Sequence, residues 1–281
     1  MRSPVLSNPH THTQFCDASS SAEEMVLSAI AHGFHTLGFS SHSYYPPDTD
    51  WCLSKEGIPL YIDEVHRLQA LYSARIKIRL GLELDYYSLG HMDLSPYEYL
   101  IGSVHDYLDP VSGKLYTYDY TVDLFKEMLD EAFHGDPILL AKTYYRDLVR
   151  LMQEQKPLIL GHFDLITKFN ETLHLFSLSN PVYRSLSSEA LLACCESGCT
   201  VVEVNTGGII RGYKKTPYPD PYYLKLLLEH HIPVMLSSDC HEASAIAGGF
   251  DQMASLLAEI GFKSVLELGP DNLLIETPLG S

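Results

Sequence analysis

The stretch PVMLSSDCH, residues 233–241, shows the pattern that decides the fold of this chain. It begins with a short apolar run, Pro233–Ser237, and continues directly into Asp239 and His241. Apolar runs of this length are typical of strands buried on both faces in a parallel sheet. Carboxylates and imidazoles are common ligands of zinc, manganese and iron. This stretch therefore predicts a buried strand that ends in a metal-binding pair.

Six further β-prone runs precede this one, and helical patterns separate them. The predicted strands are Pro4–Asn8, Thr36–Ser40, Lys77–Leu82, Tyr99–Ser103, Leu158–Gly161, Thr200–Val204 and Pro233–Ser237. The predicted helices are 21–33, Leu60–Arg75, Thr121–Phe133, Ala141–Gln155, Ser188–Ser197, Tyr222–His231 and Phe250–Ile260. Strands that alternate with helices predict an α/β fold with a parallel sheet. Seven such units favour a closed (β/α) barrel over an open sheet, with segments 107–118 and 207–221 as loops at its catalytic face.

The composition is that of an ordinary globular protein, with 281 residues, 46% hydrophobic and 20% charged. This length suits a single barrel, so we expect one domain over 1–281. The formal net charge of -17 argues against a nucleic-acid groove and against an anionic membrane surface. The sequence shows neither a long apolar span nor a secretory leader, and its cysteines form no C-x-x-C pair. These features predict a cytoplasmic protein with free thiols.

Side chains that can bind metal ions follow every predicted strand but the sixth, which is followed by Asn205. The candidates are His10, His12, Asp17, His42, Glu83, His105, His162, Asp239 and His241. In a parallel barrel the carboxyl ends of the strands converge on one mouth. A single histidine at a strand end is more often structural than a ligand. Structural histidines would not be expected, however, to recur at the carboxyl ends of successive strands. The nine candidate side chains are also more than one ion needs. The sequence therefore predicts two or three metal ions.

Local spacing supports this prediction. In an extended segment, residues two apart point to the same side, so His10 and His12 can bind one ion. The same spacing directs Asp239 and His241 to the mouth and turns Cys240 away from it. Glu83 ends an apolar strand, where an unpaired carboxylate would be costly to bury. Metal binding removes that cost, and the two oxygens of the carboxylate could bridge two ions.

Taken in order, these motifs resemble the PHP (polymerase and histidinol phosphatase) superfamily. The motifs are H-T-H at 10–12, S-S-H at 40–42, G-L-E at 81–83, G-S-V-H at 102–105, G-H-F-D at 161–164 and S-D-C-H at 238–241. Together they cover nearly the whole chain. The stretch E-V-N-T-G-G at 203–208, which runs on to Arg211 and Pro217, is similar to the histidinol-phosphate phosphatase branch of that family.

The resemblance implies a distorted (β/α)7 TIM-like barrel with three divalent metal ions (zinc, manganese or iron) at the carboxyl-terminal mouth of the strands. Carried over by motif, the first ion would be held by His10, His12, Glu83 and Asp239. The second would be held by Glu83, as a bridge, with His105 and His162. The third would be held by Asp17, His42 and His241. Asp164, two residues after His162, is expected to support that histidine from behind.

The resemblance also implies hydrolysis of L-histidinol phosphate to L-histidinol and phosphate, in histidine biosynthesis. The expected nucleophile is a hydroxide that bridges two ions, because a bound cation lowers the pKa of water toward about 7. Asp239 and His241 are candidates for proton transfer. Arg211 is a catalytic and phosphate-binding candidate because its planar fork suits phosphate oxygens. Lys168 and Asn205 are the other candidates for substrate contacts.

Three alternatives remain open on the sequence. The first is another hydrolase of the same superfamily, acting on a nucleotide or a different phosphate monoester with the same metal ligands. The second is an amidohydrolase-type barrel, which also opens with H-x-H, but that interpretation lacks a bridging lysine and leaves His42, His105 and His241 unexplained. The third is a metal-binding module without catalysis, which would bind metal stoichiometrically and show no turnover.

Overall fold

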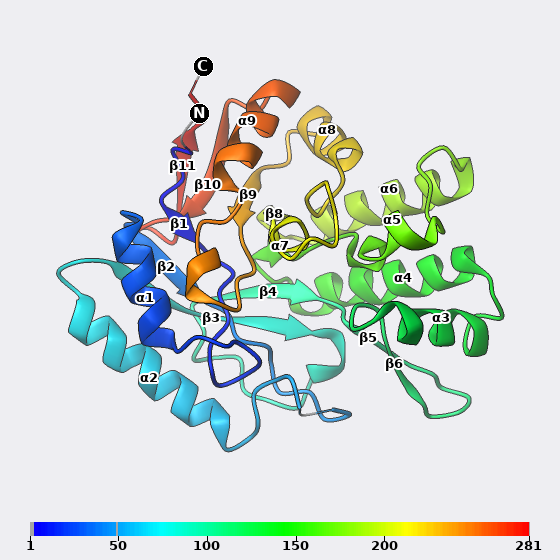
Figure 1. Ribbon diagram of the computed structural model, residues 1–281, viewed down its shortest axis with the longest axis horizontal. Helices are drawn as coiled ribbons and strands as arrows, with labels where there is room; N and C mark the ends of the chain where they lie inside the picture. The colour runs from blue at the N-terminus through cyan, green and yellow to red at the C-terminus, as the bar shows by residue number, and fades with distance from the viewer. Residues whose placement is uncertain (1–2, 49, 281) are drawn as a thin grey trace.

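The computed structural model describes residues 3–48 and 50–280, and it contains all seven predicted strands (Figure 1). They are β1 (Ser7–Asn8), β2 (Thr36–Phe39), β3 (Lys77–Asp85), β4 (Tyr99–Ser103), β7 (Ile159–Leu160), β8 (Val201–Asn205) and β9 (Val234–Ser237). The largest differences from prediction are at β1, which is shorter, and at β3, which runs on past Glu83 to Asp85. Glu83 is therefore held by the sheet itself, within a strand and not in the loop beyond it.

These strands pair in parallel, in chain order, within one sheet. Two strands absent from the prediction extend it: β10 (Ser264–Leu268) pairs in parallel with β9, and β11 (Leu274–Pro278) pairs antiparallel with β10. Another unpredicted pair, β5 (Asp106–Leu108) and β6 (Leu115–Thr117), forms a hairpin within the segment expected to be a loop. The predicted core of the sheet is confirmed, and the additions lie beside it.

The chain segments that follow β1 and β9 meet at the mouth of the barrel. Thr11 and Cys240 form an isolated parallel bridge there, with the His12 amide donating to the Cys240 carbonyl at 3.0 Å. On the other side, the Leu6 amide donates to the Glu267 carboxylate of β10 at 2.9 Å. The β1 region is thus joined to β10 and to the segment after β9 by an isolated bridge and by side-chain hydrogen bonds, and not by a continuous ladder of backbone hydrogen bonds. This is the distorted barrel that the resemblance implies.

Helices connect the parallel strands. They are α1 (Ala22–Ala31), α2 (Gly57–Tyr72), α3 (Val122–Glu131), α4 (Pro137–Gln155), α5 (Asn170–Leu173), α6 (Pro181–Glu196), α7 (Gly207–Ile210), α8 (Pro221–Glu229) and α9 (Phe250–Ile260). The predicted capping box is present: Ser21 and Glu24 each accept the other's backbone amide. Helix α6 begins well before the predicted Ser188, because the Asn180 side chain caps it and Pro181 occupies its first turn.

Figure 1 shows α1 and α2 on one side of the strands, α3 to α6 on the opposite side, and α9 beside β10 with α8 next to α9. Within the described ranges, none of the helices is long and apolar enough to span a membrane. The main core lies between these helices and the strands. A smaller cluster fills the barrel interior below the site: Tyr99, Ile101, Ile159, Val201, Met235 and Leu268. The packed interior leaves only the mouth open for chemistry.

Candidate metal centre

The histidine pair after β1 faces two carboxylates that come from distant parts of the chain. His10 Nε2 lies 3.2 Å from Glu83 Oε2, and His12 Nε2 lies 3.2 Å from Asp239 Oδ1. The backbone bridge at Thr11 fixes the extended conformation that aims both imidazoles to one side. The facing atoms His10 Nε2, His12 Nε2 and Glu83 Oε2 are buried and have no hydrogen-bond partner among the described residues. Unpaired lone pairs buried together are costly, and a shared cation would satisfy them.

The other oxygen of Glu83 faces a second pair of histidines. His162 Nε2 lies 2.8 Å from Glu83 Oε1, and His105 Nε2 lies 3.4 Å from it. These histidines follow β7 and β4, the strands next in order beyond β3 in the sheet. Glu83 is 1% exposed. It therefore sits between two separate groups of ring nitrogens, with one oxygen toward each.

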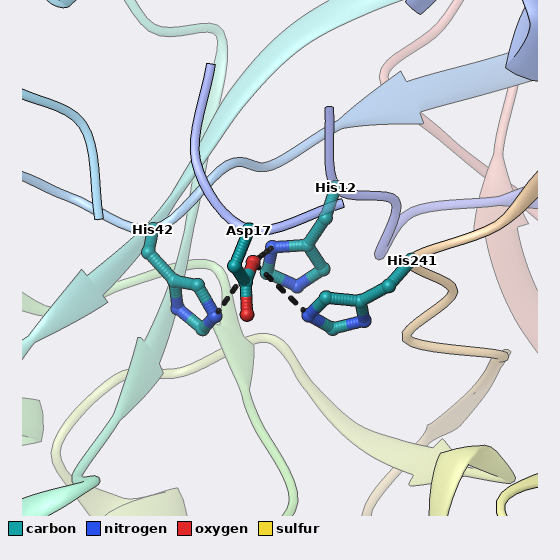
Figure 2. Close-up of side chains that lie close together, drawn as sticks. All are labelled: His12, Asp17, His42 and His241. Carbon is teal, nitrogen blue, oxygen red and sulfur yellow. Dashed lines mark ion pairs between the residues drawn. The ribbon is translucent and has the colours of Figure 1, made fainter. Parts of the chain in front are cut away.

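A third group surrounds Asp17 at the entrance (Figure 2). Asp17 Oδ1 lies 3.3 Å from His241 Nε2, 3.8 Å from His42 Nε2 and 3.9 Å from His12 Nδ1. The Asp17 side chain is 35% exposed, so this group opens to solvent. His42 also places its Nδ1 2.8 Å from Glu83 Oε2 and so connects the entrance to the buried groups.

All nine candidate ligands thus meet at one mouth. Seven of them form three overlapping clusters whose ligand atoms are close enough to share an ion: His10, His12, Asp17, His42, Glu83, His105 and His241. The other two adjoin these clusters directly, since Asp239 faces His12 and His162 faces Glu83. The structure therefore brings together every residue that the strand-end pattern singles out.

Two carboxylates behind the histidines orient their rings. Glu203 Oε1 lies 2.6 Å from His10 Nδ1, and its Oε2 accepts the His162 amide at 2.7 Å. Asp85 Oδ2 lies 3.1 Å from His105 Nδ1. Such contacts hold the other ring nitrogen toward the site, as carboxylates commonly do for metal-bound histidines. The strand-end pattern assigns Glu203 no role, although a carboxylate inside the apolar strand VVEVN is a visible signal.

Asp164 does not play the supporting role expected of it. His162 Nδ1 is buried without a hydrogen-bond partner in the described chain, and Asp164 instead faces Lys214. The chain leaves the extended conformation after His162 and turns into a short 3-10 helix over Leu165–Thr167. The two-residue spacing therefore no longer brings Asp164 and His162 to the same side.

The buried charges in the centre depend on one another. Burial opposes the ionisation of Glu83, yet His10 holds the pKa of this carboxyl well below its usual value. Burial also opposes protonation of His10, but Glu203 raises the pKa of its imidazole well above the ordinary value. In contrast, burial and the neighbouring His241 lower the pKa of His12 to about 3. A neutral His12 beside ionised carboxylates is the protonation state that a metal cation requires of its ligands.

Arg211 lies at the mouth against Asp239. Its Nη2 is 3.1 Å from Asp239 Oδ2, and its Nη1 donates to the Asp239 carbonyl at 2.8 Å. Asn205 Nδ2 donates to the same Oδ2 at 3.2 Å. Lys168, by contrast, is held by Asp119, whose Oδ2 lies 3.1 Å from its ammonium. Arg211 and Asn205 are thus in direct contact with the predicted ligands, while Lys168 is paired elsewhere.

The only tryptophan of the sequence, Trp51, borders the centre. Its ring packs edge-to-face against His42 at 4.8 Å and lies 5.5 Å from His105. Trp51 is half-buried. It comes from the loop between β2 and α2, where periodicity carries no information, so no sequence pattern assigns it a role.

A model of the PHP domain family matches residues 8–206. The chain belongs to the PHP domain family. The match covers most of the chain and includes seven of the nine candidate ligands, all but Asp239 and His241. Asp239 and His241 follow β9. The bridge between Thr11 and Cys240 places them beside the seven candidate ligands within the match.

Two curated relatives of this PHP chain carry the same activity in their names. One, from Schizosaccharomyces pombe, is named "Probable histidinol-phosphatase" and is 28% identical, covering 95% of this chain and 91% of its own. The other, the histidinol-phosphatase of Bacillus subtilis, is also 28% identical, covering 86% of this chain and 96% of its own. Both alignments cover more than 206 residues of this chain and so reach beyond the region that the family model matches.

A solved structure shares the fold of this PHP chain. It is histidinol phosphate phosphatase from Lactococcus lactis in complex with zinc, L-histidinol and phosphate. The two chains superpose with a TM-score of 0.68 at 22% identity, over 92% of this chain and 95% of the other. The likeness confirms the barrel. The clustered histidines and carboxylates themselves have the chemistry of a divalent-metal site.

Proposed function

We propose that this PHP chain is a histidinol-phosphate phosphatase, which hydrolyses L-histidinol phosphate to L-histidinol and phosphate. The observation that carries the proposal is the buried Glu83 carboxylate, whose two oxygens both face imidazoles: His10, His12 and His42 at Oε2, and His105 and His162 at Oε1. Relatives that match over most of the chain and are named for this activity support the choice of substrate. The L. lactis structure, which contains L-histidinol and phosphate, supports it further.

The metal assignment is part of the proposal. His10, His12, Glu83 and Asp239 would hold one ion; Glu83, His105 and His162 a second; Asp17, His42 and His241 a third. The contacts that support these groups are the ones described above, each between side chains that face one another across the mouth. Zinc, manganese and iron all suit nitrogen and carboxylate ligands. When bound, such ions supply a nucleophilic water at neutral pH and neutralise phosphoryl oxygens.

Side chains of the protein would bind the phosphate, orient Asp239 and protonate the leaving group. Arg211 is the phosphate-binding group, because its guanidinium lies at the mouth and offers paired donors to phosphoryl oxygens. Asn205 orients Asp239 through Oδ2 and can offer its amide to the same phosphate. Lys168 would have to leave Asp119 to reach substrate. The departing alkoxide needs a proton, and the candidate donor is the partly exposed imidazole of His241, next to Asp239.

The test is phosphate release from a panel of monoesters by zinc-loaded protein. The panel contains L-histidinol phosphate, a nucleoside monophosphate, a sugar phosphate and p-nitrophenyl phosphate. We expect kcat/KM for L-histidinol phosphate to exceed the others by at least about tenfold, a transition-state preference of about 1.4 kcal/mol. Comparable values for all four would point to a general PHP phosphoesterase. An amide substrate is assayed beside the panel, and its turnover without turnover of any ester would favour the amidohydrolase alternative.

Metal dependence is tested by removing and restoring zinc. Chelation should abolish phosphate release, and added zinc should restore it. Glu83→Gln should lose most bound metal and at least about a thousandfold in kcat/KM, since two sites share this residue. Asp17→Asn should lower the zinc stoichiometry by one equivalent. The exposed Glu154→Gln on α4 is the control. Unchanged metal content in Glu83→Gln would remove the basis of the proposal. The cytoplasmic location and the lack of a nucleic-acid partner stay predictions.

A further inference from the structure

A cavity of about 380 Å³ lies outside the metal centre, between the loops after β7 and β8 and the helices α6 and α8. Asp164 and Lys214 line it, together with an aromatic and aliphatic wall of Tyr183, Tyr223, Phe176 and Leu178. The predicted metal ligands and substrate contacts all lie within the described ranges, and none of them lines this cavity. It therefore requires an explanation of its own.

The polar residues of the cavity are a buried pair whose hydrogen bonding is incomplete. Lys214 Nζ donates to Thr167 Oγ1 at 2.6 Å and lies 3.7 Å from Asp164 Oδ2. The two charged side chains are only 6% and 1% exposed. Asp164 Oδ2 also accepts the Asp220 amide at 3.2 Å, but Oδ1 is buried with no partner in the part of the chain that the structure describes. An unsatisfied buried carboxylate oxygen is costly, so the site favours a ligand that donates a hydrogen bond there.

The ammonium of Lys214 also has unused hydrogen-bond donors. An ammonium has three donors, and Thr167 occupies one of them at normal distance. The ammonium also lies over the Tyr218 ring, 4.2 Å from its centroid. This cation–π contact holds the ammonium in place and does not use a second N–H in a conventional hydrogen bond. The pair thus presents an acceptor that lacks a donor and a cation that can take a further acceptor.

The surroundings restrict the ligand further. Tyr183, Tyr223 and Phe176 are almost fully buried and give one wall an aromatic, largely apolar surface. At the entrance, Lys215 and Glu171 pair with each other, with 3.4 Å between Nζ and Oε2. The charges of this rim pair therefore offset each other. This arrangement suits a molecule with a donor, an anionic acceptor and a ring, and it suits a polyanion poorly.

We propose that this cavity is a second binding site, for an α-amino acid with an aromatic or heteroaromatic side chain. Its amine meets Asp164 Oδ1, its carboxylate meets Lys214 Nζ, and its ring packs against Tyr183 and Tyr223. The ring of Tyr218 separates this site from the metal centre. One side of the ring contacts Lys214, and its centroid lies 6.4 Å from that of His162. Both sites can therefore be filled at once.

Titration calorimetry on the zinc-loaded protein, with its active site saturated by inorganic phosphate, tests the proposal. The probes are L-histidine, L-phenylalanine, L-tyrosine and L-tryptophan. We expect at least one to bind at one molecule per chain and phosphate not to compete with it. Failure of all four to bind would overturn the proposal. Competition with phosphate would also overturn it, because it would place the probe in the metal centre.

Two variants locate the site. Lys214→Met removes the cation, and Leu178→Trp fills the cavity while leaving the buried pair intact. Each should weaken binding of the probe at least about tenfold, and Leu178→Trp covers the case in which Lys214→Met fails to fold. Glu154→Gln on α4, which does not line the cavity and pairs with Arg150, is the control and should bind normally. Binding unchanged in Leu178→Trp would show that the probe lies elsewhere. The proposal is independent of the substrate assigned above, because zinc and phosphate occupancy are held constant.

Discussion

Glu203 shows how one carboxylate can set the geometry of two predicted ligands. It is fully buried in β8, where its two oxygens bind the ring of His10 and the backbone amide of His162. Burial opposes its ionisation, but the adjacent His10 ring, through its electrostatic interaction and its hydrogen bond, holds the pKa of Glu203 below the usual value. An ionised carboxylate in this position keeps the Nδ1 proton of His10 and leaves Nε2 free to face Glu83.

Replacing this carboxylate by an amide gives the first prediction. Glu203→Gln keeps an oxygen for His10 but removes the charge that fixes the tautomer. We expect zinc affinity to fall about 10- to 100-fold, as for other residues that orient metal ligands, with little change in fold. Competition against a chromogenic chelator measures the affinity, and circular dichroism checks the fold. Equal affinity in the variant and in the Glu154→Gln control would show that Glu203 serves packing alone.

Arg211 gives a second prediction, which separates substrate binding from metal binding. Arg211→Met removes the donors to phosphate but leaves every predicted ligand in place. Hydrogen bonds to charged groups contribute about 1.5–3 kcal/mol, so KM should rise about 10- to 100-fold. Zinc content should not change. Arg211→Lys should recover only part of the loss, because an ammonium lacks the planar fork. A parallel loss of zinc would instead show that Arg211 acts by holding Asp239.

Individual ligands are predictable from the sequence because they recur at one phase of the strand–helix pattern. Asp85 and Glu203 support histidines across the sheet, and contacts between strands far apart in sequence leave no local pattern. The prediction for Asp164 is wrong because the chain departs from the extended conformation directly after His162. Residue spacing predicts direction only while the backbone stays extended.

Among the elements, β10 connects the last part of the chain to the first. Its Glu267 accepts the Leu6 amide at 2.9 Å, lies 3.4 Å from His35 Nε2 and also accepts the Thr277 hydroxyl of β11. Burial opposes its ionisation, but bonds from His35, Thr277 and Leu6 hold the pKa of Glu267 below its ordinary value. One side chain thus joins the edge of β1 to the β10–β11 hairpin.

The third prediction concerns the pH dependence of this junction. A depressed folded-state pKa stabilises the protein above the unfolded pKa, about 4.3 for Glu, and this stabilisation is lost as pH falls through the folded value. Glu267→Gln should therefore lower the free energy of unfolding by about 1–3 kcal/mol at pH 7. The difference from the wild type should shrink below about pH 4. Urea denaturation in chelator across this range measures both. A constant difference at all pH values would assign the loss to packing.

Strands with buried apolar runs are predictable, and edge elements are not. Most of the predicted strands contain a short apolar run, whereas β11, at the end of the sheet, mixes Leu274 and Ile275 with Glu276 and Thr277. The hairpin of β5 and β6 is short and rich in polar residues, so its sequence resembles a loop. Polar edge strands are stabilised by their partners, and a single sequence does not contain the partner's position.

For the whole molecule, the sheet joins the two halves of the chain. The strands at residues 7–8 and 264–268 lie next to each other. The Thr11–Cys240 bridge joins the segments that follow β1 and β9, and so completes the ring of strands at the mouth. We therefore propose that 1–281 is a single domain. Barrel closure can be inferred from the number of strand–helix units, but not its form, because the closing contacts are an isolated bridge and side-chain hydrogen bonds, such as those of Asn8 with Ser238 and of Glu267 with Leu6.

The barrel interior depends on Tyr99 and on two glycines opposite it. Tyr99 extends from β4 across the barrel, and its hydroxyl donates to the Pro9 carbonyl at 2.5 Å. A Cβ at Gly38 would collide with the Tyr99 hydroxyl, and one at Gly81 would collide with its ring. The contact with Pro9 places this ring just below His10. Packing of the interior is thus coupled to the position of the metal centre.

The last prediction tests that coupling with a double-mutant cycle. Gly38→Ala should cost about 1–3 kcal/mol, or more if the strands must move apart, because overpacking forces neighbours from their positions. Tyr99→Phe should cost about 1 kcal/mol through the lost hydrogen bond to Pro9. The double variant should lose less than the sum of the two, since Tyr99→Phe removes the atom that the new methyl group meets first. Urea denaturation gives the three free energies, and zinc titration shows whether affinity follows them. Additive losses would mean that the cost of the methyl group arises at another neighbour, such as Leu268, whose Cδ1 would lie 2.6 Å from the same Cβ.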